Sequence, residues 1–263
     1  MKYTVLYSGS SGNCAFIKIA DKCILIDAGV SCKKITMGLE NHRINLNQVE
    51  AIMLTHEHTD HVLGLRQLVD KHNIKLYTTR KTYYAIAGKN RPESLENIVF
   101  MEQTTLFPSL DLKVECLPIS HDVVEGLYFI FYWGHVKFVY LTDSGYIPEK
   151  HHEKIMNADG YVIESNHEPE LVLKSRYPWN IQHRILSDKG HLSNQDCALL
   201  LQKVVGNRTK NVILAHISEE ANRPDLAYSR TREALDAIGE QKIKLAVALR
   251  DNIDFPIVEL EDV

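Results

Sequence analysis

The stretch Thr55-His56-Glu57-His58-Thr59-Asp60-His61 decides how the rest of this sequence is interpreted. It follows the apolar run Ala51–Thr55, which predicts a buried strand. In an extended segment the side chains of His56 and His58 point the same way, so both can converge on one metal ion. Asp60 and His61 come after the expected turn and can face a second ion. Imidazole and carboxylate ligands suit zinc, manganese, iron or nickel, so the stretch predicts a metal centre rather than an incidental histidine-rich loop.

Composition places the chain among ordinary globular proteins. Of its 263 residues, 44% are hydrophobic and 24% are charged, and the length suffices for one large domain or two small ones. No linker is evident, so we expect a single domain over residues 1–263. The net charge of −4 carries no global basic signature, so a nucleic-acid partner would need a local basic patch.

The sequence gives no sign of membrane insertion or export. No apolar run approaches the roughly 18–20 residues that span a bilayer, and Met1–Ala20 lacks the layout of a signal peptide. The five cysteines are odd in number, scattered and free of any CxxC pair. This usage indicates reduced thiols that serve as small buried hydrophobic groups, and hence a cytoplasmic protein with no membrane partner.

Short apolar runs predict a chain of strands interrupted by a few helices. The expected strands are Tyr3–Tyr7, Ala15–Ile19, Cys23–Ile26, Ala51–Thr55, Leu76–Thr79, Lys113–Leu117, Leu127–Tyr132, Val136–Thr142, Ala158–Glu164, Val212–His216 and Lys244–Ala248. The expected helices are Val62–His72, Asn194–Val204 (capped by Ser193 or Asn194) and Ala227–Ile238. Trp133-Gly134-His135 is expected to be a hairpin turn. The order favours an α/β fold of mixed sheets covered by helices.

The pattern His56-x-His58-x-Asp60-His61 resembles the HxHxDH signature of the metallo-β-lactamase superfamily. Four further segments resemble the other motifs of that superfamily in the expected order: Ile24–Gly29, Ile119–Asp122, Leu141–Gly145 and Leu214–Ser218. The resemblance covers essentially the whole chain. It implies the αββα four-layer sandwich, in which two mixed sheets carry helices on their outer faces.

The resemblance also implies a ligand set for two divalent metal ions, zinc or manganese. The first ion would be held by His56, His58, His121 and Asp143, and the second by Asp60, His61, His216 and the same bridging Asp143. Asp27 would orient a ligand histidine. The ions would lie roughly 3.5–4 Å apart and would convert a bridging water to hydroxide, which attacks a carbonyl or phosphorus, with Asp60 accepting or orienting its proton.

Glu164 and His191 resemble a pair found in the RNase Z-like phosphodiesterase branch of the superfamily. There the histidine protonates the leaving oxygen while the glutamate holds its imidazole, because an alkoxide leaves poorly without an acid. We therefore expect His191 to be the general acid and Glu164 its partner. The alternative is that His191 merely flanks the start of the helix Asn194–Val204.

Several loops bear on the choice of substrate. Ser8–Asn13 follows a strand, and its Ser10, Ser11 and Asn13 could bind an anion, although an ordinary tight hairpin is the alternative. Asn166 is a further candidate for substrate binding. The opening Gly-Ser-Ser-Gly-Asn, with the segments around Asp143, Glu164 and His216, is similar to the WalJ/YycJ family, whose members are described as DNA exonucleases. The resemblance implies a nucleic-acid substrate.

Local charge agrees with a nucleic-acid substrate. Lys71–Arg91 holds six cations and no acids, with Tyr77, Tyr83 and Tyr84 among them, as expected of a surface that grips phosphates and stacks bases. A second basic run covers Lys174–Leu192. Either run could instead be an ordinary solvated face. Asp143 and His216 are too close in sequence for a β-CASP insertion, and no long Gly/Pro-rich insertion suggests a tRNA-gripping arm, so DNA is favoured over RNA.

Other functions stay open at this stage. A thioester or lactone hydrolase resembling glyoxalase II, or a cyclic phosphodiesterase, would use the same metals. A redox diiron site or a regulatory binding module would not need hydrolysis. The native metal, the polarity of cleavage, the choice of DNA or RNA and the oligomeric state are not fixed by the sequence.

Overall fold

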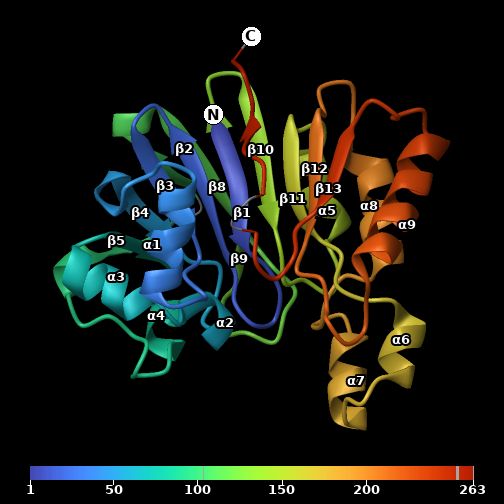
Figure 1. The fold of residues 1–263 in the computed structure, drawn as a ribbon, viewed down its shortest axis with the longest axis horizontal. Coiled ribbons are helices and arrows are strands. Elements are labelled where there is room, and N and C mark those ends of the chain that lie inside the picture. The colour runs from blue at the N-terminus through green and yellow to red at the C-terminus, as the bar shows by residue number, and fades with distance from the viewer. Residues whose placement is uncertain (103, 253–254, 263) are drawn as a thin grey trace.

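The computed structural model describes residues 1–102, 104–252 and 255–262 and contains two seven-stranded sheets (Figure 1). The first sheet has the order β14 (Val258–Glu259), β1 (Lys2–Tyr7), β2 (Cys14–Ile19), β3 (Lys22–Ile26), β4 (Val49–Met53), β5 (Lys75–Thr78), β6 (Ile98–Phe100). The second has the order β13 (Lys244–Val247), β12 (Asn211–Ala215), β11 (Gly160–Glu164), β10 (Val136–Leu141), β9 (Leu127–Trp133), β8 (Leu112–Pro118), β7 (Thr104–Phe107).

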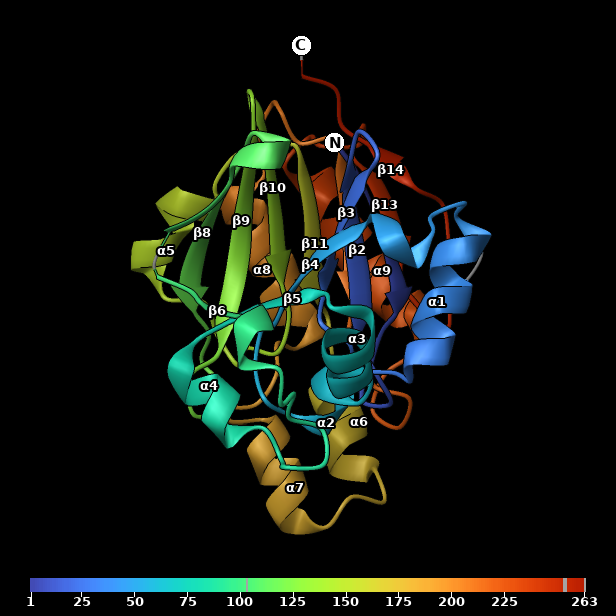
Figure 2. The ribbon, with the colours of Figure 1, turned by 90° about the vertical axis from the view of Figure 1, so that its left-hand side faces the viewer.

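Helices cover the outer face of each sheet (Figures 1 and 2). Beside the first sheet lie α1 (Cys32–Asn41), α2 (Thr59–Val62), α3 (Leu65–His72) and α4 (Arg80–Ala85). Beside the second lie α5 (Glu149–Ile155), α8 (Asn194–Val204) and α9 (Pro224–Ala237). Short 3-10 turns occur at Leu46–Gln48, Leu95–Asn97 and Pro108–Leu110. These layers are the αββα sandwich that the sequence predicts, which confirms the fold class.

Two further helices, α6 (Pro169–Lys174) and α7 (Trp179–Ile185), project beyond the end of the second sheet at which α2 lies (Figures 1 and 2). The sequence predicts no protruding arm, and this helical pair is a short projection rather than a long Gly/Pro-rich insertion. No helix among the described residues is both long and apolar enough to cross a membrane.

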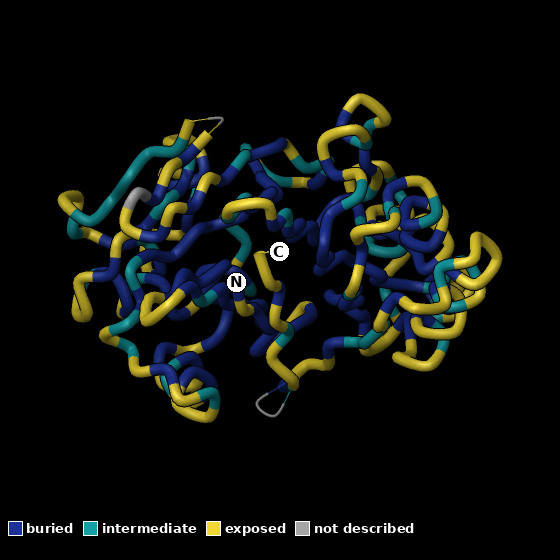
Figure 3. The backbone as a smooth tube through the Cα atoms, turned by 90° about the horizontal axis from the view of Figure 1, so that it is seen from above, coloured by how far each residue is buried: buried dark blue, intermediate teal, exposed yellow. Residues whose placement is uncertain are grey.

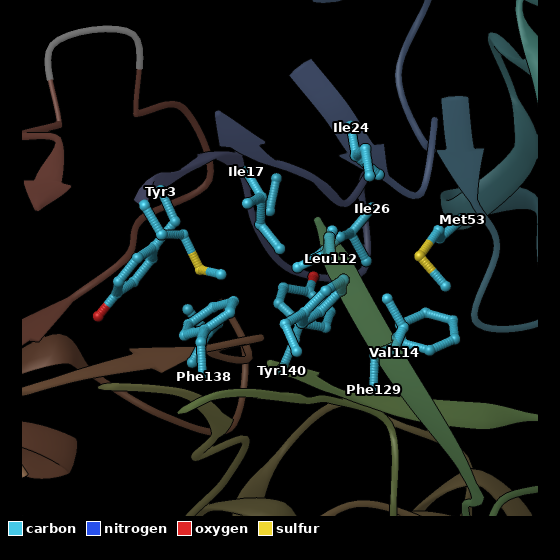
Figure 4. Packing of buried hydrophobic residues seen from close by; sticks show 14 of the residues in the cluster. Tyr3, Ile17, Ile24, Ile26, Met53, Leu112, Val114, Phe129, Phe138 and Tyr140 are labelled. Atoms are coloured by element: carbon cyan, nitrogen blue, oxygen red, sulfur yellow. The ribbon is translucent and has the colours of Figure 1, made fainter. Parts of the chain in front are cut away.

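Alternating side chains place the main core between the sheets. In β1, Tyr3 and Val5 enter the cluster between the sheets, whereas Leu6 packs under the helices of the outer face. This alternation follows from the period of two in a strand. The Tyr3 and Phe138 rings, from opposite sheets, meet with centroids 4.1 Å apart (Figure 4). Figure 3 shows the buried backbone in the interior, with exposed segments toward the periphery.

The two sheets direct the ends of their parallel strands toward one edge of the molecule. In the second sheet, β10, β11 and β12 are mutually parallel neighbours. In the first sheet, β3 and β4 are parallel. Loops that leave the carboxyl ends of parallel strands meet at one edge, where ligands bind in many α/β proteins. The motif residues Asp27, Asp143, Glu164 and His216 each lie at the end of one of these strands or within two residues of it.

The expected strands are all present, and their bounds differ by a few residues from those predicted. The prediction of a single helix over Val62–His72 is wrong, because the chain forms α2 and α3 with a break at Gly64. A Cβ at Gly64 would lie 2.3 Å from the carbonyl oxygen of Val30. The backbone N–H of Gly64 donates to the carbonyl oxygen of Ala28. The backbone is thus held close to the loop after β3, which interrupts the helix. The sequence pattern also gave no expectation for α1 and α4 to α7, or for β6, β7 and β14.

Candidate metal centre

The four buried histidines of the motifs all present the same ring nitrogen to a common centre. Their Nδ1 atoms are held by the protein: His61 by Asp27 at 2.8 Å, His216 by Glu164 at 2.8 Å, His121 by the carbonyl oxygen of Gly190 at 2.8 Å and His56 by the Thr55 hydroxyl at 3.0 Å. Holding Nδ1–H on an acceptor leaves the Nε2 lone pair free to bind a metal ion. The histidines are therefore oriented as ligands before any ion binds.

Thr55 and Asp27 connect two of these histidines. The Thr55 hydroxyl lies 2.9 Å from Asp27 Oδ2, and the Thr55 N–H donates to Asp27 Oδ1 at 2.8 Å. Because the single hydroxyl proton goes to the carboxylate, the oxygen accepts from the Nδ1–H of His56. Asp27 thus orients His61 directly and His56 through Thr55.

The candidate ligands lie close together in overlapping sets. Their ligand atoms lie within 4.8 Å of one another in each of three sets: His56, His58 and His121; Asp60, His61 and His216; His56, His61 and Asp143. Asp143 therefore lies where it could bridge two ions. A pocket of about 340 Å³ opens onto these residues. It is lined by Ser10, His58, Thr59, Asp60, His121, Asp143, Arg184, His191 and His216.

Orphaned polar atoms indicate that this centre is built for cations. Among the described residues, the buried Nε2 of His56, Nε2 of His216 and Oδ2 of Asp143 have no hydrogen-bond partner. Buried polar atoms are rarely left unpaired, because their desolvation is not compensated. The nitrogen and oxygen donors fit divalent metal ions such as zinc or manganese.

The electrostatics of the centre lead to the same conclusion. Burial lowers the pKa of His216, but the Asp143, Asp60 and Glu164 carboxylates outweigh it and raise that pKa to about 10. Burial likewise lowers the pKa of His61, while Asp27, Asp143 and Asp60 raise it well above its usual value. Without a cation, protons on these imidazoles therefore balance the carboxylates. Divalent ions would replace those protons.

Glu164 joins the metal centre to His191. Its Oε1 accepts from Nδ1 of His191 at 2.7 Å and from Nδ1 of His216 at 2.8 Å. Its Oε2 accepts the backbone N–H groups of Ser144 and Leu192 at 2.9 and 3.2 Å. Burial raises the pKa of Glu164, but the neighbouring imidazoles hold it below its usual value, so the group is a carboxylate. The sequence suggested the contact with His191 but not the one with His216.

Close backbone approaches and unusual dihedral angles shape the centre. Asp27, Asp143 and His216 have φ angles of 62°, 58° and 56°, in the left-handed region that non-glycine residues seldom adopt. Such strain is retained where the surrounding structure imposes it, often at functional sites. A Cβ at Gly29 would lie 1.6 Å from the carbonyl oxygen of Asp60, so only glycine fits there. None of these features has a signal in a single sequence.

The predicted substrate-binding residues lie in different environments. Ser10 and Ser11 are exposed, and Ser10 lines the metal pocket. Asn13 is buried, and its amide nitrogen contacts Asp60 and His61. Asn166 is also buried and donates to the carbonyl oxygen of His216 at 2.8 Å. Asn13 and Asn166 therefore hold the metal-site loops, and Ser10 is the one of the four that faces the pocket.

The first basic run does not form the expected stacking surface. Tyr83 is only 4% exposed, and its hydroxyl donates to Pro92. The Tyr77 ring packs against Phe107, with centroids 4.7 Å apart. The interpretation of Tyr83 as a base-stacking group is wrong, because its ring is buried; Tyr77 is partly buried, and its role stays a prediction. Tyr84 is exposed. In the second run, Arg184 lines the metal pocket and pairs with Asp122 at 3.0 Å.

Comparisons with known proteins agree with this geometry. Residues 22–217 match the β-lactamase superfamily domain. The exodeoxyribonuclease WalJ of Streptococcus pneumoniae is 39% identical over 231 residues, which cover 86% of this chain and 85% of that protein. The exodeoxyribonuclease YycJ of Bacillus anthracis is 35% identical over 241 residues, covering 91% and 90% of the two chains.

Solved structures share the fold over nearly the whole chain. The metallo-β-lactamase fold protein YhfI of Bacillus subtilis superposes with a TM-score of 0.70 at 14% identity, covering 98% of each chain. Human tRNase Z, short form, superposes with a TM-score of 0.65 at 16% identity, covering 99% of this chain and 100% of that one.

The matched domain and the donor set together define a metal-dependent hydrolase, and the chain belongs to the metallo-β-lactamase superfamily. Within that superfamily, its similarity at 35–39% identity is to the WalJ/YycJ family.

Proposed function

We propose that this protein is a phosphodiester hydrolase acting on nucleic acid, and specifically a DNA exonuclease. The observation that carries the proposal is that His191, at the wall of the metal pocket, is held by the buried Glu164, with 2.7 Å between Oε1 and Nδ1. A phosphodiester with an alkoxide leaving group needs an acid, which a thioester hardly needs. The two bacterial relatives are exodeoxyribonucleases, which supports DNA as the substrate.

The ligand set proposed is the one that the sequence implies. His56, His58, His121 and Asp143 would hold one divalent ion, and Asp60, His61, His216 and Asp143 a second, each zinc or manganese. When bound, such ions supply an activated water at neutral pH and neutralise charge on the phosphate oxygens. The unpartnered Nε2 atoms of His56 and His216 and the unpartnered Asp143 Oδ2 support this assignment.

The residues of the chain divide the remaining tasks. Asp60 is 24% exposed at its side chain and lines the pocket, so it can accept or orient the proton of the attacking water. His191 donates a proton from Nε2 to the leaving oxygen, since its Nδ1 is held by Glu164. The Glu164 carboxylate stabilises the imidazolium that this requires. Arg184, at the pocket wall, can contact a phosphate oxygen.

The test compares leaving groups. The metal-reconstituted protein is given end-labelled DNA and, separately, bis(p-nitrophenyl) phosphate, whose nitrophenolate leaves without an acid. In His191→Ala we expect a loss of about 10²–10⁴-fold in kcat on DNA and little change on the aryl ester. Asp60→Ala should lose activity on both. If the wild type cleaves neither substrate but hydrolyses a chromogenic thioester, the proposal is wrong.

A further inference from the structure

A second pocket adjoins the metal pocket, and His191 lines both. We call it the distal pocket. Its volume is about 380 Å³, which falls in the range of small-molecule sites. The wall residues that matter below are Tyr146, His167, Leu186, Asp196 and Leu199, together with His191. None of the candidate metal ligands is among the residues that line it, so its chemistry is separate from that of the ions.

One residue that lines the distal pocket carries a buried, unsatisfied polar atom. His167 is only 2% exposed, and its Nδ1 has no hydrogen-bond partner among the described residues. Burial and the nearby His191 lower the pKa of His167 to about 4, so its imidazole is neutral at pH 7. A neutral imidazole both donates and accepts, which suits the edge of a nucleobase better than an anion.

The rest of the wall is suited to a flat, uncharged group. Tyr146 and Leu199 are 46% and 45% exposed, and Leu186 presents further apolar surface. Two carboxylates, of Asp188 and Asp196, line the pocket against the single ammonium of Lys203. This charge balance disfavours a free phosphate, whereas a nucleobase can stack on the aromatic ring and the apolar side chains.

The reaction geometry connects the two pockets. Nδ1 of His191 is held by Glu164, so the proton for the leaving oxygen comes from Nε2. The leaving group therefore lies against His191, and whatever is attached to its oxygen continues past that ring. The distal pocket is the cavity that shares His191 with the metal pocket.

We propose that the distal pocket binds the nucleoside attached to the leaving oxygen, with its base against Tyr146 and Leu199 and within reach of His167. The proposal rests on the proposed phosphodiesterase function for its reaction, but binding of a nucleoside does not need the metal ions. It assigns a base-contacting role to residues outside the metal motifs.

Binding is tested without catalysis. Equilibrium dialysis measures thymidine and deoxyadenosine binding to chelator-treated protein. Leu199→Trp fills the pocket from a partly exposed position on α8, and Leu173→Trp is the matched control, because Leu173 is 64% exposed on α6 and lies outside the pocket. We expect the wild type and the control to bind equally and Leu199→Trp to bind about tenfold more weakly, equivalent to about 1.4 kcal/mol. Absence of nucleoside binding by the wild type overturns the proposal.

Catalysis gives the second test. Thymidylyl-thymidine releases a nucleoside, whereas the p-nitrophenyl ester of thymidine monophosphate releases nitrophenolate. Leu199→Trp should raise KM about tenfold on the dinucleotide and leave the aryl ester unchanged. Equal effects on both substrates would contradict the proposal. If the wild type binds nucleosides yet cleaves neither substrate, the phosphodiesterase function fails while the nucleoside site stands.

Discussion

Replacing Glu164 by glutamine tests the contact that joins the general acid to the metal centre. The carboxylate accepts four hydrogen bonds, two imidazole N–H groups on Oε1 and two backbone N–H groups on Oε2. An amide keeps one accepting oxygen, so its NH₂ group must face two donors in either orientation. Each unsatisfied buried donor costs about 1–3 kcal/mol, so Glu164→Gln should destabilise the protein by about 2–6 kcal/mol.

The same substitution should affect metal binding and catalysis together. Losing the partner of a ligand histidine typically weakens metal affinity about 10–100-fold, here through His216. Loss of the carboxylate beside His191 should lower kcat on DNA further than on an aryl phosphodiester.

Urea unfolding, competition with a metal-binding dye and the two-substrate assay measure these three effects. Glu170→Gln is the control, because that carboxylate is 85% exposed. Unchanged stability and metal affinity in Glu164→Gln would show that the Glu164 carboxylate does not hold His216 and His191.

Further predictions concern the backbone and the protons of the centre. Gly29→Ala should destabilise the protein by about 3 kcal/mol and reduce its metal content, because the new Cβ would lie 1.6 Å from the Asp60 carbonyl oxygen. Thermal unfolding measures the loss of stability. The control is Gly88→Ala, because a Cβ at Gly88 would meet open space. Adding Mn²⁺ or Zn²⁺ to metal-free protein at pH 7.5 should release protons, because the pKa of His216 is raised to about 10 and ions must displace that proton. Metal affinity should therefore fall as the pH falls. An indicator dye in weak buffer measures the release, which His216→Ala should reduce; equal release from both proteins would argue against a protonated His216.

The sequence predicts much of the centre because its main motif is local. His56, His58, Asp60 and His61 lie within six residues, in the loop after β4 and the first turn of α2, so their closeness follows from the short length of chain that joins them. Short apolar runs likewise predict the strands that were expected, all of which are present. The single domain over residues 1–263 stays a prediction.

What the sequence missed depends on contacts between distant segments. Glu164 reaches His216 because β11 and β12 are parallel neighbours in a particular register, with Glu164 opposite Ala215. The break at Gly64 depends on Val30, and the burial of Tyr83 on the segment around Pro92. Local patterns do not contain such information, since it arises from the packing of one element on another.

The most direct test of the account is anomalous diffraction from crystals of protein prepared without chelator and loaded with manganese or zinc. We expect two peaks, one bounded by His56, His58 and His121 and the other by Asp60, His61 and His216, with Asp143 between them. A single peak, or peaks away from these side chains, would contradict it.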